Sequence, residues 1–80
     1  MSEAWYCVRS VVTDGAGHSI VDTDVMPKSA LNDTLRNLKS MYNGQVSRSR
    51  PGLPFQRWTF GQRLSDGRWV SDTVIASRIH

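Results

Sequence analysis

The segment from Phe55 to Leu64 alternates between large apolar side chains and polar ones. Successive side chains of a β-strand point to opposite faces, so this alternation predicts a strand with one buried face and one solvated face. The buried side requires a second layer, because an isolated sheet cannot cover its own apolar face. We expect Trp58, Phe60 and Leu64 on the buried side, and Arg57, Thr59 and Arg63 on the solvated side.

Two further segments predict a hairpin at the start of the chain. Ala4 to Thr13 is rich in β-branched and aromatic residues, and Ser19 to Met26 alternates valine and threonine with aspartate. Between them, Gly15 and Gly17 can adopt positive φ, which favours a tight turn. We therefore expect an antiparallel pair of strands.

One amphipathic helix is predicted after Pro27, which ends the second strand. Ser29 is a suitable N-cap, Asp33 would lie in the first turn near the positive end of the helix dipole, and Gly44 is a typical stop signal. An apolar stripe spaced at four, three and four residues would face the sheet, beside a polar and basic stripe. The apolar stripe consists of Leu31, Leu35, Leu38 and Tyr42, and the polar stripe of Asn32, Arg36, Lys39 and Asn43.

The segment from Gly44 to Pro54 is rich in glycine, proline and serine, so we expect a surface loop with Arg48 and Arg50 at its tip. After the alternating strand, Ser65-Asp66-Gly67 predicts a turn into a partner strand. The final residues, 73–80, fit either a continued strand or a short helix.

The predicted order of elements is therefore ββαββ. The simplest arrangement is a two-layer α+β domain, in which one helix packs on one face of a four-stranded antiparallel sheet. Residues 1–80 are sufficient for one small domain and leave no room for a second.

A single cysteine, Cys7, excludes an intrachain disulfide and a multi-cysteine zinc site, and it favours a reducing compartment. The first residues lack the basic region and long apolar run of a signal peptide, and no apolar stretch reaches the roughly 18 residues of a membrane span. We therefore expect a cytoplasmic protein that does not enter a membrane.

The charges are segregated along the chain: Thr34 to Ser65 contain six basic residues and no Asp or Glu, whereas the remaining residues sum to −3. A concentrated positive field steers acidic partners, and arginine makes paired hydrogen bonds with carboxylate and phosphate. The stretch predicts a surface for an acidic protein or for nucleic acid, with an ordinary solvated surface as the alternative. The candidate partner-binding residues are Arg48, Arg50, Arg57 and Arg63, then Arg36, Lys39 and Phe55, the ring expected to be exposed on the arginine side.

The first hairpin carries a second candidate surface, formed by Asp14, Asp22 and Asp24. Asp22 and Asp24 share one strand face, but neither the spacing of a calcium loop nor the convergent donors of a zinc site is present. We therefore expect no metal and no other cofactor. An acidic patch that enters a basic groove of a partner and a plain solubilising surface remain alternatives.

The sequence offers little for catalysis. Cys7 lies on a predicted strand, and His18 and His80 lie in a turn and at the terminus, without a recognisable nucleophile and base motif. Glu3 is the only Glu, and no pair of carboxylates has a setting that would separate their pKa values for acid and base roles. The sequence therefore indicates a non-enzymatic protein.

In size, layout and arginine-biased composition, the chain resembles the small phage-encoded inhibitors of bacterial defence, among them the anti-CRISPR proteins. The closing segment Leu64-Ser65-Asp66-Gly67-Arg68-Trp69-Val70 is similar to the aromatic-rich hairpin that ends some of these inhibitors. The resemblance implies a monomer in the host cytoplasm that binds a subunit of a CRISPR surveillance complex and blocks its binding of target DNA.

Many such inhibitors are acidic, whereas this chain has a net charge of +3. Two modes of inhibition are therefore open: the acidic hairpin enters a basic DNA-reading pocket, or the arginines bind an acidic subunit surface. The alternative function is direct binding of nucleic acid through the arginine-rich surface.

Overall fold

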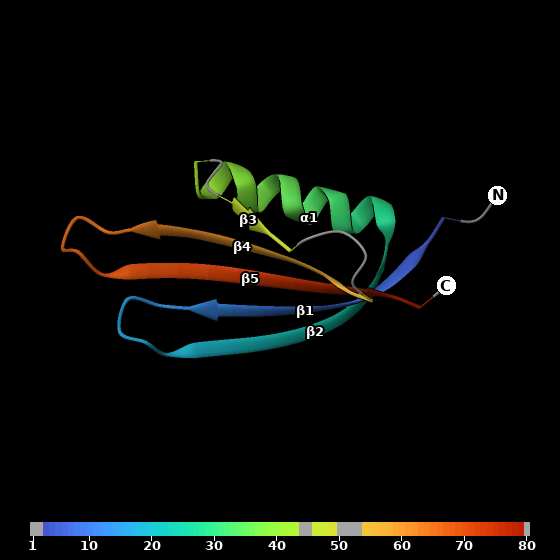
Figure 1. The fold of residues 1–80 in the computed structure, drawn as a ribbon, viewed down its shortest axis with the longest axis horizontal. Helices are drawn as coiled ribbons and strands as arrows, with labels where there is room; N and C mark the ends of the chain where they lie inside the picture. Colours follow the sequence, from blue (N-terminus) through green and yellow to red (C-terminus); the bar gives the residue numbers. More distant parts are fainter. Residues whose placement is uncertain (1–2, 44–45, 50–53, 80) are drawn as a thin grey trace.

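The computed structural model describes residues 3–43, 46–49 and 54–79 as one helix on a five-stranded antiparallel sheet (Figure 1). The strand order is β2-β1-β5-β4-β3, so the first and last strands are neighbours at the centre. The elements are β1 (Trp5–Thr13), β2 (Ser19–Pro27), α1 (Lys28–Met41), β3 (Val46–Arg48), β4 (Gln56–Arg63) and β5 (Trp69–Arg78).

The helix packs on one face of the sheet near the two chain ends, and the hairpin turns reach beyond it (Figure 1). The result is an elongated molecule of 48 × 22 × 22 Å. We call the sheet face that packs against α1 the helix side and the opposite face, which no described element covers, the open face. Because a directly paired residue lies on the same face as its partner, the strand register assigns every strand residue to one of them.

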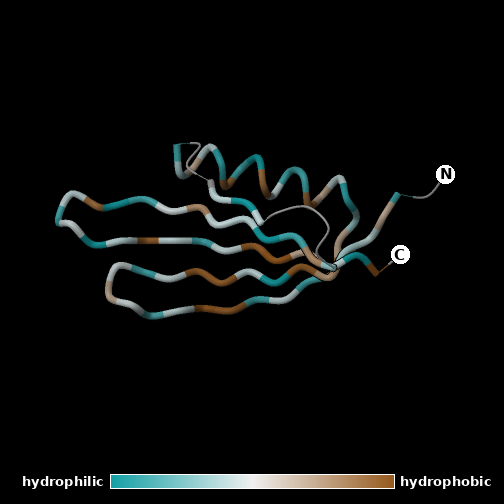
Figure 2. The backbone as a smooth tube through the Cα atoms, viewed as in Figure 1, coloured by the Kyte–Doolittle hydropathy of each residue, from teal (hydrophilic) through white to brown (hydrophobic). Residues whose placement is uncertain are grey.

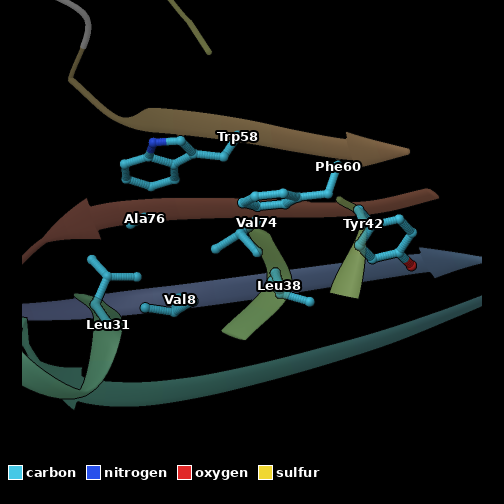
Figure 3. Packing of buried hydrophobic residues seen from close by; sticks show 8 residues of the cluster. All are labelled: Val8, Leu31, Leu38, Tyr42, Trp58, Phe60, Val74 and Ala76. Carbon is cyan, nitrogen blue, oxygen red and sulfur yellow. The ribbon is translucent and has the colours of Figure 1, made fainter. Parts of the chain in front are cut away.

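The core lies between α1 and the helix side of the three central strands (Figure 3). Phe60 and Val74 are the most completely enclosed side chains, and the Tyr42 and Phe60 rings lie 6.3 Å apart. Burial of one such aliphatic or aromatic side chain contributes roughly 1.5–3 kcal/mol. The cluster consists of Val8, Leu31, Leu38, Tyr42, Trp58, Phe60, Val74 and Ala76. The predicted inward orientation of Trp58 and Phe60 is confirmed.

The N-terminus of α1 differs from the sequence expectation. The helix begins at Lys28 without a side-chain cap from its own first residues, so Ser29 is not the N-cap and Asp33 lies beyond the first turn. Instead, the Glu3 carboxylate accepts a hydrogen bond of 2.9 Å from the Ser29 amide. A carboxylate at this end is favourable because it meets unpaired N–H groups and the positive end of the dipole. At the other end, Asn43 adopts a left-handed φ of 54°.

The α+β class and the antiparallel sheet are confirmed, but the prediction of four strands is wrong by one. Residues Val46 to Arg48, in a segment predicted to be a loop, form a strand that pairs with β4 and places Arg48 opposite Trp58. Pairing to β4 supplies backbone hydrogen bonds that composition alone does not reveal. The ambiguous final residues continue as strand to Arg78, because β5 lies between β1 and β4 and is paired on both sides.

When the backbone is coloured by the hydropathy of each residue, β1 and β2 show hydrophobic segments that lie next to each other (Figure 2). These segments correspond to the directly paired residues Val11 with Val21, and Val12 with Ile20.

Within the described residues, no helix has the length and apolar character needed to cross a membrane.

Candidate binding surfaces

The sheet separates charge by face. Arg9 of β1 and Arg57 of β4 both pair with Ile75 of β5, so the two guanidinium groups leave the open face on either side of this residue. Arg63 lies six residues further along β4, an even number, so it belongs to that face as well. The strand aspartates lie on the helix side: Asp22 opposite Ser10, Asp24 opposite Val8, and Asp72 opposite Val12. The described strand residues of the open face therefore include three arginines and no acidic residue.

The open face also exposes apolar side chains. Val11 pairs with both Val21 and Thr73, which places a β-branched row next to the row that contains Ile75. The exposed fractions of Val21 and Val25 are 48% and 52%. Contiguous exposed apolar area beside arginine is characteristic of protein interaction sites, where aromatic residues and arginine are enriched and acidic residues are depleted.

Near the hairpin end of the open face, Trp69 lies over Gly61. A Cβ at position 61 would come within 2.3 Å of the Trp69 Cζ2 atom, so the indole occupies the space of a missing side chain. Arg63 pairs directly with Trp69 and donates from Nη1 to the Gly67 carbonyl at 3.0 Å. Trp69 is half exposed. This end of the face thus combines an accessible aromatic ring with a guanidinium group whose position a backbone hydrogen bond restrains.

A second basic surface lies on the helix side, along the gap between α1 and strands β3 and β4. Two hollows of about 340 and 320 Å³ share Leu35, Arg48 and Trp58 in their lining and therefore form one continuous depression. No acidic residue lines either hollow among the described residues. We name this depression the helix groove; its cations are Lys28, Arg36, Lys39 and Arg48, and its apolar lining includes Leu31, Leu35, Trp58 and Phe60.

Arg48 is held in the helix groove by the strand that the sequence did not predict. Its register opposite Trp58 puts it on the helix side, and its guanidinium carbon lies 5.8 Å from the Trp58 ring centroid, a cation–π distance. Arg57, one residue before Trp58, is on the open face. Arg48 and Arg57 therefore cannot act on one surface, because the sheet lies between the two side chains.

Five of the seven residues predicted to bind a partner divide between two surfaces. Arg57 and Arg63 belong to the open face, where Arg9 joins them, whereas Arg36, Lys39 and Arg48 line the helix groove, where Lys28 joins them. Arg50 lies outside the described residues. The sequence missed Arg9 and Lys28 because both lie outside the acid-free stretch and reach these surfaces only through tertiary structure.

Phe55 does not occupy the exposed position expected for it. The side chain is half buried and lines a small hollow of about 160 Å³ together with Tyr6 and Ala76, which belong to the helix side. Strand β4 begins only at Gln56, so the alternation that placed Phe55 with the arginines does not extend to it.

The three aspartates of the acidic hairpin do not converge. Asp14 lies in the turn, where its Oδ1 accepts hydrogen bonds of 2.9 Å from the amides of Ala16 and His18. The hydrogen bond from the His18 backbone N–H is the main cause of the lowered pKa of the Asp14 carboxyl. Asp22 and Asp24 are exposed on the edge strand β2, on one face as predicted. Asp14 therefore stabilises the hairpin turn, which leaves only Asp22 and Asp24 of this group to bind a partner.

Asp72 is an acidic residue that the sequence reading did not single out. It is 9% exposed on the helix side of β5, between Val12 and Phe60, and its Oδ1 accepts no hydrogen bond from any described residue. Burial raises the pKa of the Asp72 carboxyl, and the charge of Asp72 adds to the effect of burial in raising the pKa of Tyr42. The alternation of Val70, Asp72 and Val74 would have revealed this position once the strand was extended.

The described residues contain no group of three or more His, Cys, Asp or Glu side chains that could hold a metal ion. Cys7 is half buried near the start of β1, opposite Val25, whereas His18 lies in the turn at the far end of the same hairpin.

No protein-family model matches this chain, and no match was found among curated proteins or solved structures.

Proposed function

We propose that this protein is a non-enzymatic binding protein whose open face docks on an acidic surface of a protein partner. The observation that supports it is the separation of charge by face: Arg9, Arg57 and Arg63 leave an apolar, acid-free side of the sheet. Val11, Val21 and Ile75 supply apolar area between and beside the arginines, while the arginines direct the encounter and set the orientation.

The inhibitor role expected from the resemblance to anti-CRISPR proteins is the narrower form of this proposal. In it, the partner is a subunit of a CRISPR surveillance complex, the complex forms in the host cytoplasm with one copy of this chain, and target DNA is occluded without chemistry. The net charge of +3 favours the arginine mode over the acidic mode. The acidic mode also has few carboxylates to use, because Asp14 accepts hydrogen bonds within the turn and only two exposed aspartates of the hairpin lie outside it.

Adjacent residues of β2 allow a matched test of the docking face. Val21 lies on the open face and Ile20 on the helix side, and both are exposed. A photo-crosslinking residue at position 21 should capture the partner in cells, and the same residue at position 20 should not. The captured protein is then purified and titrated with the wild-type chain.

The Arg9→Glu/Arg57→Glu variant should weaken the purified complex more than tenfold, whereas Arg68→Glu at a hairpin tip should leave it unchanged. Capture from position 20 alone, or unchanged affinity in the double variant, would contradict docking through the open face. The narrower hypothesis has its own assay: a purified surveillance complex should lose target-DNA binding on addition of the wild-type chain. If DNA binding persists, the inhibitor role is wrong even where the docking face is right.

A second candidate function, direct binding of single-stranded nucleic acid, is favoured by one observation. The exposed Trp69 ring lies over Gly61 beside Arg63, which is a suitable arrangement for stacking a base and contacting its phosphate. Oligothymidylate should then bind with a log–log salt slope of about −0.7 per phosphate contact, and Trp69→Ala should weaken it. Absence of binding at low salt would remove this candidate.

A further inference from the structure

The helix groove lies on the other side of the sheet from the open face and has its own chemistry. Within the described residues, Lys28, Lys39 and Arg48 make no ion pair. Arg36 pairs with Asp33 at 3.3 Å, and both of these side chains are largely exposed. Four cations therefore surround an acid-free depression while remaining available to an external anion. A positive cluster in which three of the four cations have no ion pair with any residue that the structure describes attracts carboxylates or phosphates.

The cations extend along the groove. Lys28 and Lys39 stand at the two ends of α1, eleven residues apart, which corresponds to about 16 Å along a helix axis. Arg36 lies between them on the helix, and Arg48 faces them from β3, in contact with the Trp58 ring. An extended polypeptide advances about 3.3 Å per residue, so roughly five residues span this distance.

The lining of the groove is apolar and its aromatic rings are covered. Trp58 is 9% exposed and Phe60 is 2% exposed, so neither ring is accessible enough for a base to stack on it. The amides of Asn32 and Gln56 line the first hollow and can exchange hydrogen bonds with a peptide backbone. At the rim, β3 is the last strand of the sheet, so its outer edge is not paired by another described strand. Such an edge can accept an added strand.

From these features, we propose that the helix groove binds an extended acidic peptide segment in which acidic residues alternate with apolar ones. The apolar side chains contact Leu35 and the rim of Trp58, and the carboxylates pair with Lys28, Arg36, Lys39 and Arg48. Alternation matters because successive side chains of an extended chain point to opposite sides. This site is independent of the open face, so the chain has two basic surfaces that can be occupied together.

The test uses the intact protein and a synthetic five-residue peptide that alternates Glu and Leu, with a Gln and Leu peptide as the uncharged control. Titration followed by NMR should shift the Trp58 indole and Leu35 amide signals with the Glu peptide and leave the Arg9 and Ile75 amides unchanged. The Lys28→Glu/Lys39→Glu variant should bind about tenfold more weakly, as expected when two exposed attractive pairs become repulsive.

The matched control is Arg9→Glu/Arg57→Glu, which makes the same change in net charge on the open face and should bind the peptide as the wild type does. Three results would overturn the proposal: equal affinity for the Glu and Gln peptides, equal weakening by both double variants, or tighter binding of pentathymidylate at the Trp58 and Leu35 signals. The last result would make the groove a nucleic-acid site. Because Lys28→Glu/Lys39→Glu leaves the open face intact, cross-linking from position 21 still reports on the proposed function.

Discussion

The Trp69 indole fills the position that a side chain on Gly61 would take, with a Cβ at position 61 only 2.3 Å from the Trp69 Cζ2 atom. Gly61 has no positive φ, so its glycine identity is explained by this contact and not by backbone conformation. The pair therefore makes the shape of the open face near Arg63 dependent on one missing methyl group.

The first prediction concerns Gly61→Ala. The added methyl group should displace the Trp69 ring and lower the free energy of unfolding by about 1–3 kcal/mol, the usual effect of overpacking. Chemical denaturation measures the loss, and the NMR signal of the Trp69 indole N–H reports the displacement. In a Trp69→Ala background the same substitution should be neutral or stabilising, because alanine has the better strand propensity there. An equal loss in both backgrounds would place the strain elsewhere.

The second prediction concerns the buried carboxyl of Asp72. Its pKa in the folded chain is raised, so its contribution to stability is fully present below the unfolded pKa of about 3.9 and is lost as the pH rises through the folded pKa. Asp72→Asn should therefore increase the free energy of unfolding at pH 7 by on the order of 1 kcal/mol, since it removes an unpaired buried charge. The difference should shrink as the pH approaches 3.

Denaturation of wild type and Asp72→Asn at several pH values tests this expectation. Asp22→Asn is the matched control, because Asp22 lies on the same face but is exposed. A larger advantage for Asp72→Asn at pH 3 than at pH 7 would reverse the sign of the inferred pKa shift.

The third prediction concerns the helix start. The Ser29 amide donates to Glu3, and this hydrogen bond lowers the pKa of the Glu3 carboxyl. Its stabilising effect is therefore present above the ordinary glutamate pKa of about 4.3 and is lost as the pH falls through the lower folded value. Glu3→Gln should lower Tm at pH 7 and have little effect at pH 2. A pH-independent difference in Tm would show that charge at the helix terminus is not the cause.

The fourth prediction compares two valines on opposite faces. Val74 has no exposed surface and lies between α1 and the sheet, whereas Val25 is 52% exposed on the open face. Val74→Ala should lower the free energy of unfolding by about 2 kcal/mol through lost burial and an unfilled cavity, and Val25→Ala by less than about 0.5 kcal/mol. Urea denaturation distinguishes them. Comparable losses would mean that the open face is covered in solution, for example by a second copy of the chain.

Local periodicity was sufficient to predict most individual elements. The alternation around Trp58 and Phe60 predicted a strand with its aromatic residues inward, and the spacing of Leu31, Leu35 and Leu38 predicted the buried side of the helix. These inferences succeed because side-chain direction within a strand or helix follows from position alone.

The sequence by itself therefore determined the α+β class, the inward aromatics of β4 and the opposite orientation of Arg57 and Arg63. Tertiary structure alone decided that β1 and β5 are neighbours, which brings Arg9 and Arg57 to either side of Ile75. It also decided that residues 46–48 form a strand with Arg48 over Trp58, and that Glu3 meets Ser29 across 26 positions. Pairing between strands depends on backbone hydrogen bonds between distant segments, which the local pattern of side chains does not encode.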